Sequence, residues 1–583
     1  MNELDQIEEG KKYAQVVSSQ IEAEKGEAIA YPRPSVLKGR RKIYTNYISQ
    51  SQVKPNMAGY AILNDENIVD AVNLALKIHY DNAYEIRYLL DMYKGDQPIL
   101  YRNKDVRPDV NNKIVFNYAN SFTRDIVGYT FGKPMQYVAR RTDDQADGEN
   151  GIKDEVRLLN DYSEMNNKST SDQKKATLSS ICGVAYRGVF PTDADDNEIE
   201  SGMKAPYYYL DLDSDKTFVA YSSQFMNEPV FAVTFTSSYG VNDDSFVLFY
   251  VYTVDKVYAY KVPLVGSALM YSDANSYVGA MLHNEYLVEG FPQDNPIKKI
   301  PIIECENNQF RMGHWETATT LMDAINKTGS DSVNDVEQTV NAILVAVNAE
   351  FTKEQMDNVK ENKYAEIKSY QNMPADLKYI TCAIDGSSTE QLRQYLEDCL
   401  RAIVGIPDRK TRGGGGGDTG DAVKLRDGWA DMEVVARTTE TFNKKSEKEE
   451  LKVILTILKN LKKDFKTSMI NVDIKYPRNK TDNLNSKVTA YSAMLSTNTI
   501  APDDALDIVD ITSDNAEVVR RGTDYWKKQK EENFEENLKQ LKAQSELQGA
   551  NSATQEGGNV NAKSNNKQSV DRTTDSKSRT DDK

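Results

Sequence analysis

The residues whose types and spacing could most readily support binding or catalysis form a cationic, glycine-rich stretch. Arg409, Lys410 and Arg412 precede five consecutive glycines at positions 413–417. A glycine-rich loop ahead of a helix can bind phosphate through its backbone N–H groups. The nucleotide-binding pattern GxxxxGK(S/T) is not met, because Asp421 stands where that motif needs a lysine. The sequence therefore does not predict a nucleotide site at this loop.

The same stretch combines a flexible backbone with positive charge. Five glycines leave the backbone few steric restrictions and a large conformational entropy, so we expect a mobile, weakly basic loop. One interpretation is a passive linker. The other is a contact surface for a polyanion, which is favoured because the longest predicted helix follows directly. The whole chain has a net charge of −17 and a pI of about 5.0, unlike the basic surface of a sequence-reading nucleic-acid binder. Any contact with nucleic acid should therefore be weak and local.

No catalytic or metal-binding constellation stands out elsewhere in the sequence. The chain has three isolated histidines and four widely spaced cysteines: His79, His283, His314, Cys182, Cys305, Cys382 and Cys399. The cysteines form no CxxC pair, so we expect no metal site and reduced, packed thiols. GxSxG and P-loop motifs are also missing from the sequence. The chain is therefore not predicted to be an enzyme, and no cofactor is expected.

The bulk composition indicates several packed regions rather than one large core. The chain has 583 residues, of which 39% are hydrophobic and 28% charged. At about 150 residues per unit, this length predicts roughly four structural units joined by polar helices. The first residues lack the apolar core of a signal peptide, and no apolar run reaches membrane-spanning length. We therefore expect a soluble protein with no membrane partner.

The first half of the chain predicts an α+β unit over roughly 64–305. Apolar residues recur at helical spacing in three segments, 64–93, 113–129 and 173–181, and then the period changes to two. Four strand-like segments rich in β-branched and aromatic residues follow, at 207–212, 230–235, 246–254 and 257–262. Their tyrosines could stack on bases or simply pack in a sheet, and packing is favoured. A basic cluster at 38–42 could contact nucleic acid or be a solvated surface, and the second interpretation is favoured.

The second half of the chain predicts long helices around a small insertion. A stripe from Val333 to Val347 predicts one helix, after an interruption at Gly329. An αββ insertion is expected to follow. Ser388 and Gln391 then form a capping box that opens another helix. Beyond the glycine loop, 422–465 is predicted to be one very long helix, a strand and a helical region (484–545) follow, and the polar tail should be disordered.

The order of these elements resembles the portal proteins of long-tailed bacteriophages of the Bacillus siphovirus type. Local sequence agrees at four places: a helix with a Gly-Lys-Pro entry into a strand, an Ile-Pro-Ile-Ile strand, an apolar-Pro-Asp helix exit, and the start of the long helix. These lie at 117–138, 298–308, 400–408 and 417–426. The resemblance covers roughly 64–545 and is carried by the order and spacing of the motifs.

The resemblance implies an α+β portal-type subunit with a wing, a two-helix stem, an αββ clip, a very long helix and a helical crown. The corresponding segments are a polar N-terminal extension at 1–63, the wing at 64–310, the first stem helix region at 311–348, the clip at 349–387, the second stem helix at 388–406, the tunnel loop at 407–420, the long wing helix at 421–465, the crown at 466–545 and a disordered tail at 546–583.

The resemblance also implies roles for particular residues. The tunnel loop would face DNA through Arg409, Lys410, Arg412, Gly413, Gly414, Gly415, Gly416 and Gly417. The stem residues would pack between subunits through Val336, Val340, Ile343, Leu344, Leu396 and Leu400. No catalytic or metal-binding residue is implied.

The partners implied are those of a DNA channel in a virion. They are other copies of the chain in a ring of about twelve, double-stranded DNA bound without sequence specificity, the terminase motor, the major capsid and scaffolding proteins, and a head-tail connector protein. The channel would serve genome packaging and ejection, at the capsid portal vertex of the virion, after assembly in the host cytoplasm. The alternative is another structural virion component, such as a minor head or scaffold-like protein, without a DNA channel.

Overall fold

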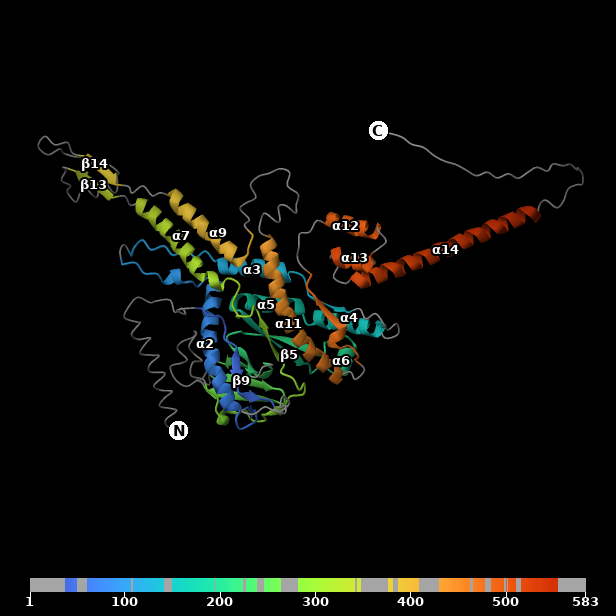
Figure 1. The fold of residues 1–583 in the computed structure, drawn as a ribbon, viewed down its shortest axis with the longest axis horizontal. Helices are drawn as coiled ribbons and strands as arrows, with labels where there is room; N and C mark the ends of the chain where they lie inside the picture. The colour runs from blue at the N-terminus through green and yellow to red at the C-terminus, as the bar shows by residue number, and fades with distance from the viewer. Residues whose placement is uncertain are drawn as a thin grey trace, which may run out of the picture. The chain divides into compact units, whose positions relative to one another are not determined.

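A computed structural model shows two compact units, Met1–Asn483 and Leu484–Lys583, which are described separately (Figure 1). The structure describes residues 37–49, 60–105, 108–140, 149–193, 195–223, 227–238, 246–263, 281–340, 343–347, 376–380, 386–407, 429–461, 465–477, 484–496, 500, 502–509 and 515–553.

The larger unit contains a six-stranded sheet in the order β1-β7-β8-β9-β10-β11. Its strands are β1 (Ile43–Thr45), β7 (Thr217–Ser222), β8 (Pro229–Ser238), β9 (Phe246–Thr253), β10 (Lys256–Pro263) and β11 (Gln293–Asp294). β1 is parallel to β7, and the other neighbours are antiparallel. Buried and partly buried residues alternate along β9, as expected for a sheet with one face covered. Helix α2 (Ile68–Lys94) packs its apolar face on the aromatic residues of this sheet.

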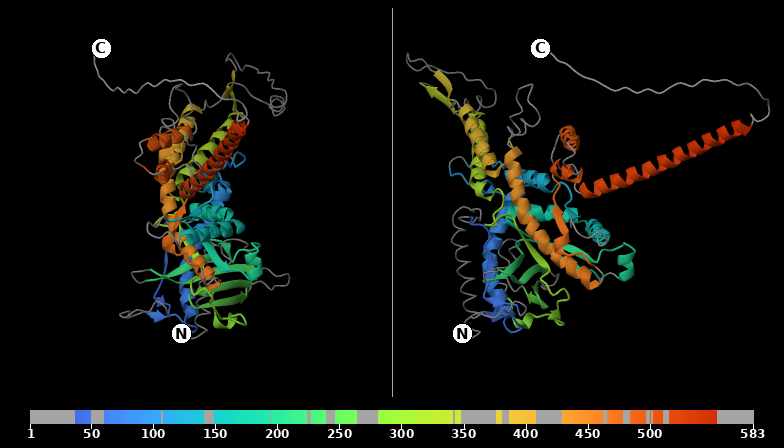
Figure 2. Two further views of the ribbon diagram at one scale, coloured as in Figure 1. Left: turned by 90° about the vertical axis from the view of Figure 1, so that its right-hand side faces the viewer. Right: turned by 45° about the vertical axis from the view of Figure 1, so that its right-hand side comes forward.

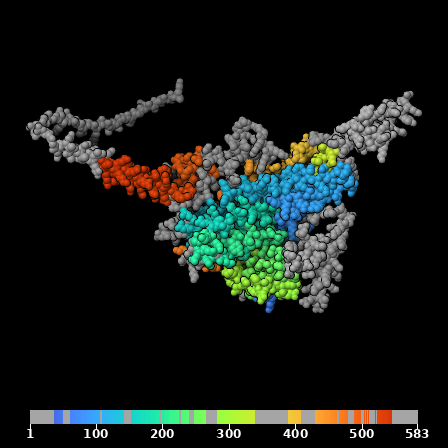
Figure 3. Space-filling model, turned by 180° about the vertical axis from the view of Figure 1, so that it is seen from behind, coloured from blue at the N-terminus to red at the C-terminus, as the bar shows by residue number. Residues whose placement is uncertain are grey.

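A three-stranded sheet, in the order β12-β5-β6, joins this layer to the helices. Its strands are β12 (Ile302–Glu306), β5 (Val184–Pro191) and β6 (Tyr207–Leu212). The helices around it are α3 (Tyr118–Phe131), α4 (Glu149–Met165), α5 (Lys168–Cys182), α6 (Asp196–Glu200) and α11 (Trp429–Leu461). Seen from behind, the segments coloured blue to green form one continuous face of this unit (Figure 3).

Two smaller sheets and four short 3-10 helices complete the described part of the larger unit, apart from the helix pair below. The strands are β2 (Tyr47–Ile48) with β3 (Ala61–Ile62), and β4 (Gln136–Ala139) with β15 (Val472–Lys475). The 3-10 helices are η2 (Pro98–Tyr101), η4 (Asn284–Tyr286), η5 (Glu316–Ala318) and η6 (Met469–Asn471).

Two helices project from the body of the larger unit, side by side in every view (Figures 1 and 2). They are α7 (Thr319–Val340) and α9 (Gly386–Val404), and they pack against each other. A two-stranded antiparallel ladder, β13 (Ile343–Val347) with β14 (Asp376–Ile380), lies at their far end.

The smaller unit is helical in the part that the structure describes. Its helices are α12 (Leu484–Ser496), α13 (Pro502–Val509) and α14 (Asn515–Ala553). α13 packs against both α12 and the first turns of α14.

The structure confirms most of the periodicity-based predictions, contradicts two of them and contains one further strand in the large sheet that was not predicted. The strand predicted at 207–212 is found with those bounds. Gly405, in the left-handed region at a φ of 76°, follows the last residue of α9 and ends the helix. Strand β7 was missed. The residues Ile343–Val347 form a strand rather than the end of a helix, because a run of β-branched residues satisfies both patterns. Gly329 does not interrupt α7.

The basic cluster at 38–42 is not simply a solvated surface, because one of its arginines is buried. Arg40 is only 3% exposed, and its Nη2 lies 2.6 Å from carboxylate oxygens of both Glu85 and Glu316. Gly39 precedes it at a φ of +78°, where a Cβ would lie 2.2 Å from the Phe310 carbonyl oxygen. The cluster is therefore a structural anchor for the start of the described chain.

Candidate functional site

The α7–α9 pair is fixed to the body of the subunit at one end. Met322 and Ile325 of α7, and Leu400 and Val404 of α9, are buried in the same core as Trp315. The Trp315 indole Nε1–H donates to the Thr123 hydroxyl at 2.9 Å, so this large side chain is buried without an unpaired donor.

A second attachment runs along α7 as a regular series of hydrogen bonds. The side chains of Asn326, Ser330 and Asn334, spaced by four residues, are at most 1% exposed. They accept hydrogen bonds from the backbone N–H groups of Phe116 (2.7 Å), Ile114 (2.9 Å) and Asn112 (2.7 Å). Four helical residues rise about 6 Å and two extended residues about 6.6 Å, so the two periods match. We call this series the α7 ladder.

Gly329 explains how the segment before α3 comes so close to α7. A Cβ at this position would lie 2.4 Å from Cε2 of the Phe116 ring. The residue is therefore a point of close approach inside a continuous helix, and the helix-breaking role predicted for it is wrong.

Away from the body, the helix pair exposes apolar side chains. The exposed fraction is 61% for Val336 on α7, and 50% and 65% for Leu392 and Tyr395 on α9. Val333 and Ile403 are also exposed. Apolar patches of this kind, with a polar surround, mark surfaces that contact another macromolecule.

Buried charge also fixes the orientation of α9. Glu397 is 3% exposed and pairs with Arg393 one turn earlier. Tyr118 of α3 lies close by, and burial, together with its hydrogen bond to Glu397, raises the pKa of the Tyr118 hydroxyl. Glu397 therefore joins the second projecting helix to α3.

The long helix α11 is attached to the body by a buried ionic cluster. Its members are three cations and three carboxylates: Lys168, Lys175, Arg187, Asp172, Glu447 and Glu450. Lys168 Nζ lies 2.9 Å from Glu447 Oε2, and Lys175 Nζ lies 2.8 Å from Glu450 Oε1. Arg187 Nη1 lies 2.7 Å from Asp172 Oδ1 and 3.1 Å from Glu450 Oε2. The formal charges of these six side chains cancel, which lowers the cost of taking them out of water together. A further carboxylate, Asp211, lies 3.7 Å from Arg187 Nε and is more exposed.

The cluster keeps Glu447 and Arg187 ionised in spite of their burial. Burial alone would raise the pKa of Glu447, but Lys168, Lys175 and Arg187 together hold that pKa well below its ordinary value. For Arg187, burial opposes ionisation, and the carboxylates of Glu450 and Asp172 outweigh it and raise the pKa. α11 is thus held by charges whose loss would leave partners unpaired.

A half-buried histidine links the same two helices a few turns away. His314 Nδ1 lies 2.9 Å from the Ser180 hydroxyl of α5, and its Nε2 lies 2.9 Å from the Thr439 hydroxyl of α11. Burial lowers the pKa of His314 to about 4. The ring is neutral at pH 7 and acts as a structural bridge between the helices.

The predicted DNA-facing residues cannot be placed in this arrangement. Arg409, Lys410, Arg412 and the glycines 413–417 lie outside the described residues, between the end of α9 and the start of α11. The predicted insertion also lies mostly outside them. Of its two predicted strands, the second overlaps β14, whose partner β13 was predicted as helix.

The predicted stem residues fall into different environments. Val336 is exposed on α7, while Leu396 is partly buried against the core. Leu400 is fully buried inside the subunit core, so its side chain leaves no surface for a neighbouring copy. Val340 is the last residue of α7. Ile343 and Leu344 belong to β13, because the helix ends before them.

Sequence reasoning missed both the ionic cluster and the α7 ladder. Lys168, Asp172 and Lys175 recur at helical spacing along α5, and Glu447 and Glu450 do so along α11. Charged residues that recur with the spacing of a buried helix face could have indicated that these side chains are buried. Their pairing partners lie more than 260 residues apart in the sequence, and no local pattern shows that.

Among the residues that the structure describes, no group of three or more His, Cys, Asp or Glu side chains could hold a metal ion. No described helix is long and apolar enough to cross a membrane.

The fold and its surfaces define a structural subunit: a buried body, a long internally anchored helix, and a projecting helix pair with exposed apolar side chains. The chain belongs to the phage portal protein family, since the model of the family described as "Phage portal protein, SPP1 Gp6-like" matches residues 75–544. No curated protein matches the chain. The family is structural rather than enzymatic, and its members are ring-forming proteins of the capsid vertex of the virion.

Proposed function

We propose that this chain is the ring-forming subunit of a phage portal, the channel for DNA packaging and ejection at one capsid vertex. The observation that carries the proposal is the family match over residues 75–544, which includes the projecting helix pair, the glycine loop and the long helix. The exposed apolar side chains of α7 and α9 support the proposal, because such side chains are stabilised when another subunit covers them.

In this proposal the main described elements take the parts that the resemblance implies. The body with its two main sheets is the wing, α7 and α9 are the stem, and β13 with β14 belongs to the clip. α11 is the long wing helix, and α12 to α14 form the crown. These assignments shift the stem boundaries by a few residues from those expected, since α7 ends at Val340 and α9 begins at Gly386.

Neighbouring copies would meet through the exposed apolar side chains of the stem. These include Val336, Leu392 and Tyr395, whereas Leu400 packs in the subunit's own core. Burying an exposed valine or leucine side chain contributes about 1.5–3 kcal/mol, and a ring repeats each contact at every interface.

DNA would pass the loop between α9 and α11 without being trapped. The acidic chain would repel the duplex, and three cations, Arg409, Lys410 and Arg412, would contact phosphates transiently. Replacing all three with alanine should alter the rate of DNA packaging and leave ring assembly intact. Loss of the ring in that variant would contradict this division of roles.

The partners follow from the same proposal. The terminase motor would dock on the clip during packaging, and head-tail connector proteins would dock there afterwards, while capsid and scaffolding proteins contact the outer surface. ATP hydrolysis would belong to the terminase.

Native mass spectrometry with negative-stain class averages of the full chain tests the proposal. We expect closed rings of about twelve copies with a central hole. A chain that remains monomeric or dimeric at high concentration, and in the presence of capsid and scaffolding proteins, would instead support a minor head or scaffold-like protein.

A further inference from the structure

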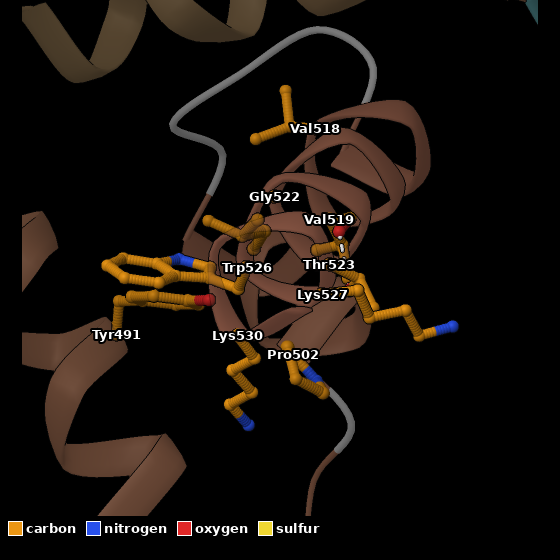
Figure 4. A pocket seen from close by; sticks show the side chains of 10 residues that line it. Tyr491, Pro502, Val518, Val519, Gly522, Thr523, Trp526, Lys527 and Lys530 are labelled. Carbon is orange, nitrogen blue, oxygen red and sulfur yellow. Dashed lines mark hydrogen bonds between the residues drawn. The ribbon is translucent and has the colours of Figure 1, made fainter. Parts of the chain in front are cut away.

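Open pockets lie on both units of the chain. The pocket of the smaller unit has a volume of about 510 Å³, and Tyr491 of α12 and Trp526 of α14, which line it, lie next to each other (Figure 4). The described residues around it do not indicate what would cover it. Another pocket, of about 490 Å³, opens on the larger unit, where the start of the described chain lies along its edge. We call it the body pocket.

The body pocket is built from three segments that are far apart in the sequence. They are 40–44, 306–311 and 442–445. Two aromatic side chains in its lining, Phe310 and Tyr44, are 64% and 47% exposed. Large apolar side chains that remain this exposed around one hollow mark a contact surface for another segment or molecule.

The same pocket carries a surplus of positive charge. Arg40 and Arg311 line it, but each has a buried carboxylate partner of its own. Lys42 and Lys445 share one carboxylate, Glu306, with Nζ–Oε distances of 3.8 and 3.1 Å. That carboxylate also contacts Arg311. Burial lowers the pKa of the Lys42 ammonium, and the neighbouring carboxylates do not offset this effect. A further carboxylate in the pocket is therefore favoured.

Residues 1–36 precede the described chain and join it at the edge of this pocket. The Arg40 backbone N–H donates to the Arg311 carbonyl at 3.1 Å. Phe310 and Arg311 both line the pocket, so the chain enters the body beside it. An extended chain spans up to about 3.3–3.6 Å per residue, so a stretch of about ten residues can cover roughly 33 Å. The pocket is therefore within reach of the residues just before the entry point.

The sequence before this entry point has the complementary composition. Glu27, Ile29 and Tyr31 alternate with alanines. A proline follows Tyr31, and the residue before a proline favours an extended backbone. In an extended segment alternate side chains point the same way, so one carboxylate and two apolar side chains would share a face. An aromatic pocket with a surplus of positive charge fits this combination.

We propose that residues 27–31 bind the body pocket of the same chain. Glu27 faces Lys42 and Lys445, and its apolar neighbours pack on the aromatic side chains of the pocket. Binding within one chain is favoured because the segment is tethered next to its site. The family match begins at residue 75, so the contact attaches an extension outside the matched region to the body. It does not depend on ring formation, and its failure would leave the proposed portal function standing.

Zero-length cross-linking of the full chain with a carbodiimide tests this contact. The reagent joins a lysine to a carboxylate when the two are in contact, so mass spectrometry should find a link from Glu27 to Lys445 or Lys42. The linked chain should run as a monomer on a denaturing gel, because the contact lies within one chain. Lys452 is the matched control. It is exposed, lies about two turns further along the same helix, and should link to Glu449 and not to residue 27.

Hydrogen–deuterium exchange gives an independent measurement. The backbone amides of residues 28–31 should exchange more slowly in the full chain than in a synthetic peptide of residues 20–36. Phe310→Ala should speed that exchange by at least about tenfold, because it removes an aromatic ring that the segment covers. Met203→Ala removes an apolar side chain that is 78% exposed outside the pocket lining, and it should leave the exchange unchanged.

The two measurements decide the matter together. A link from Glu27 to the pocket lysines, with amide protection that depends on Phe310, supports the contact. The contact is overturned if Glu27 links to Lys452 as readily as to Lys445, or if its links appear only in dimer-sized bands. Exchange of the 28–31 amides at the rate of the free peptide would overturn it as well.

Discussion

The buried ionic cluster offers the sharpest test of how α11 is held. Glu450 is fully buried and contacts two cations, with Lys175 Nζ at 2.8 Å and Arg187 Nη1 at 3.1 Å. Glu450→Gln keeps the shape of the side chain and removes its charge, so three buried cations would face two carboxylates. Breaking a buried ion pair by removing one partner costs about 3–5 kcal/mol, because the remaining charge is left uncompensated.

The chain supplies a matched control one residue earlier. Glu449 is on the same helix and pairs with Lys452 at 2.7 Å, but its side chain is 53% exposed and that of Lys452 is 44% exposed. Exposed pairs contribute about 0–1 kcal/mol, so Glu449→Gln should hardly change the free energy of unfolding. The same chemical substitution is thus placed in two environments at adjacent positions of one helix.

Urea denaturation at a fixed protein concentration, followed by tryptophan fluorescence, measures the difference. We expect the free energy of unfolding to fall by about 3 kcal/mol or more for Glu450→Gln relative to Glu449→Gln, with unchanged denaturant dependence. Adding Lys175→Met to Glu450→Gln should restore part of the loss, because it removes the surplus positive charge. If the two single variants differ by less than about 0.5 kcal/mol, the cluster is not desolvated, and α11 is held in another way.

Three further predictions concern packing, pH and assembly. Gly329→Ala should lower the melting temperature of the subunit, because the new Cβ would lie 2.4 Å from the Phe116 ring. The control Gly128→Ala, whose Cβ would meet nothing within 4 Å, should stabilise the subunit by about 1 kcal/mol. Equal shifts in melting temperature would contradict the close approach at Gly329. Burial lowers the pKa of His314 to about 4, so the unfolded chain binds a proton at this residue at a higher pH than the folded chain does. The free energy of unfolding should therefore decrease as the pH falls from 6.5 to 4, and His314→Gln should make this decrease smaller. An unchanged pH dependence in the variant would exclude His314 as its source. Val336→Glu should prevent ring formation in native mass spectrometry and leave the melting temperature of the subunit unchanged. Leu74→Glu on α2, at a similarly exposed position, should still form rings. Intact rings from Val336→Glu would show that Val336 does not lie at the subunit interface.

The secondary structure of the body could be read from the sequence because each signal is local. The alternation in 246–254 and the stripe in 64–93 depend only on residues within a few turns, and the corresponding strand β9 and helix α2 are found. The run Ile343–Val347 was mispredicted because the apolar spacing fits a helix and the β-branched composition fits a strand. Pairing with β14 decides between them, and that is a contact between distant segments that no local window contains.

Less of the candidate site than of the fold could be predicted from the sequence. The family resemblance gave the order of the parts, and the family match confirms the resemblance. The residues that hold the parts together could not be predicted, because buried charges such as Arg187 are recognisable only with their partners in view. Leu400 shows the converse: an apolar residue on a stripe can serve the subunit's own core as easily as a neighbour.

The α7 ladder also limits how this region can vary in length. Its three hydrogen bonds join a segment that advances two residues per step to a helix that advances four. Deleting one residue from α7 would rotate everything beyond it by about 100°, and deleting one from 112–116 would turn alternate N–H groups away from the helix. Only paired changes, four residues in the helix with two in the extended segment, keep the register. Homologous chains should therefore accept insertions and deletions outside this region far more readily than within it.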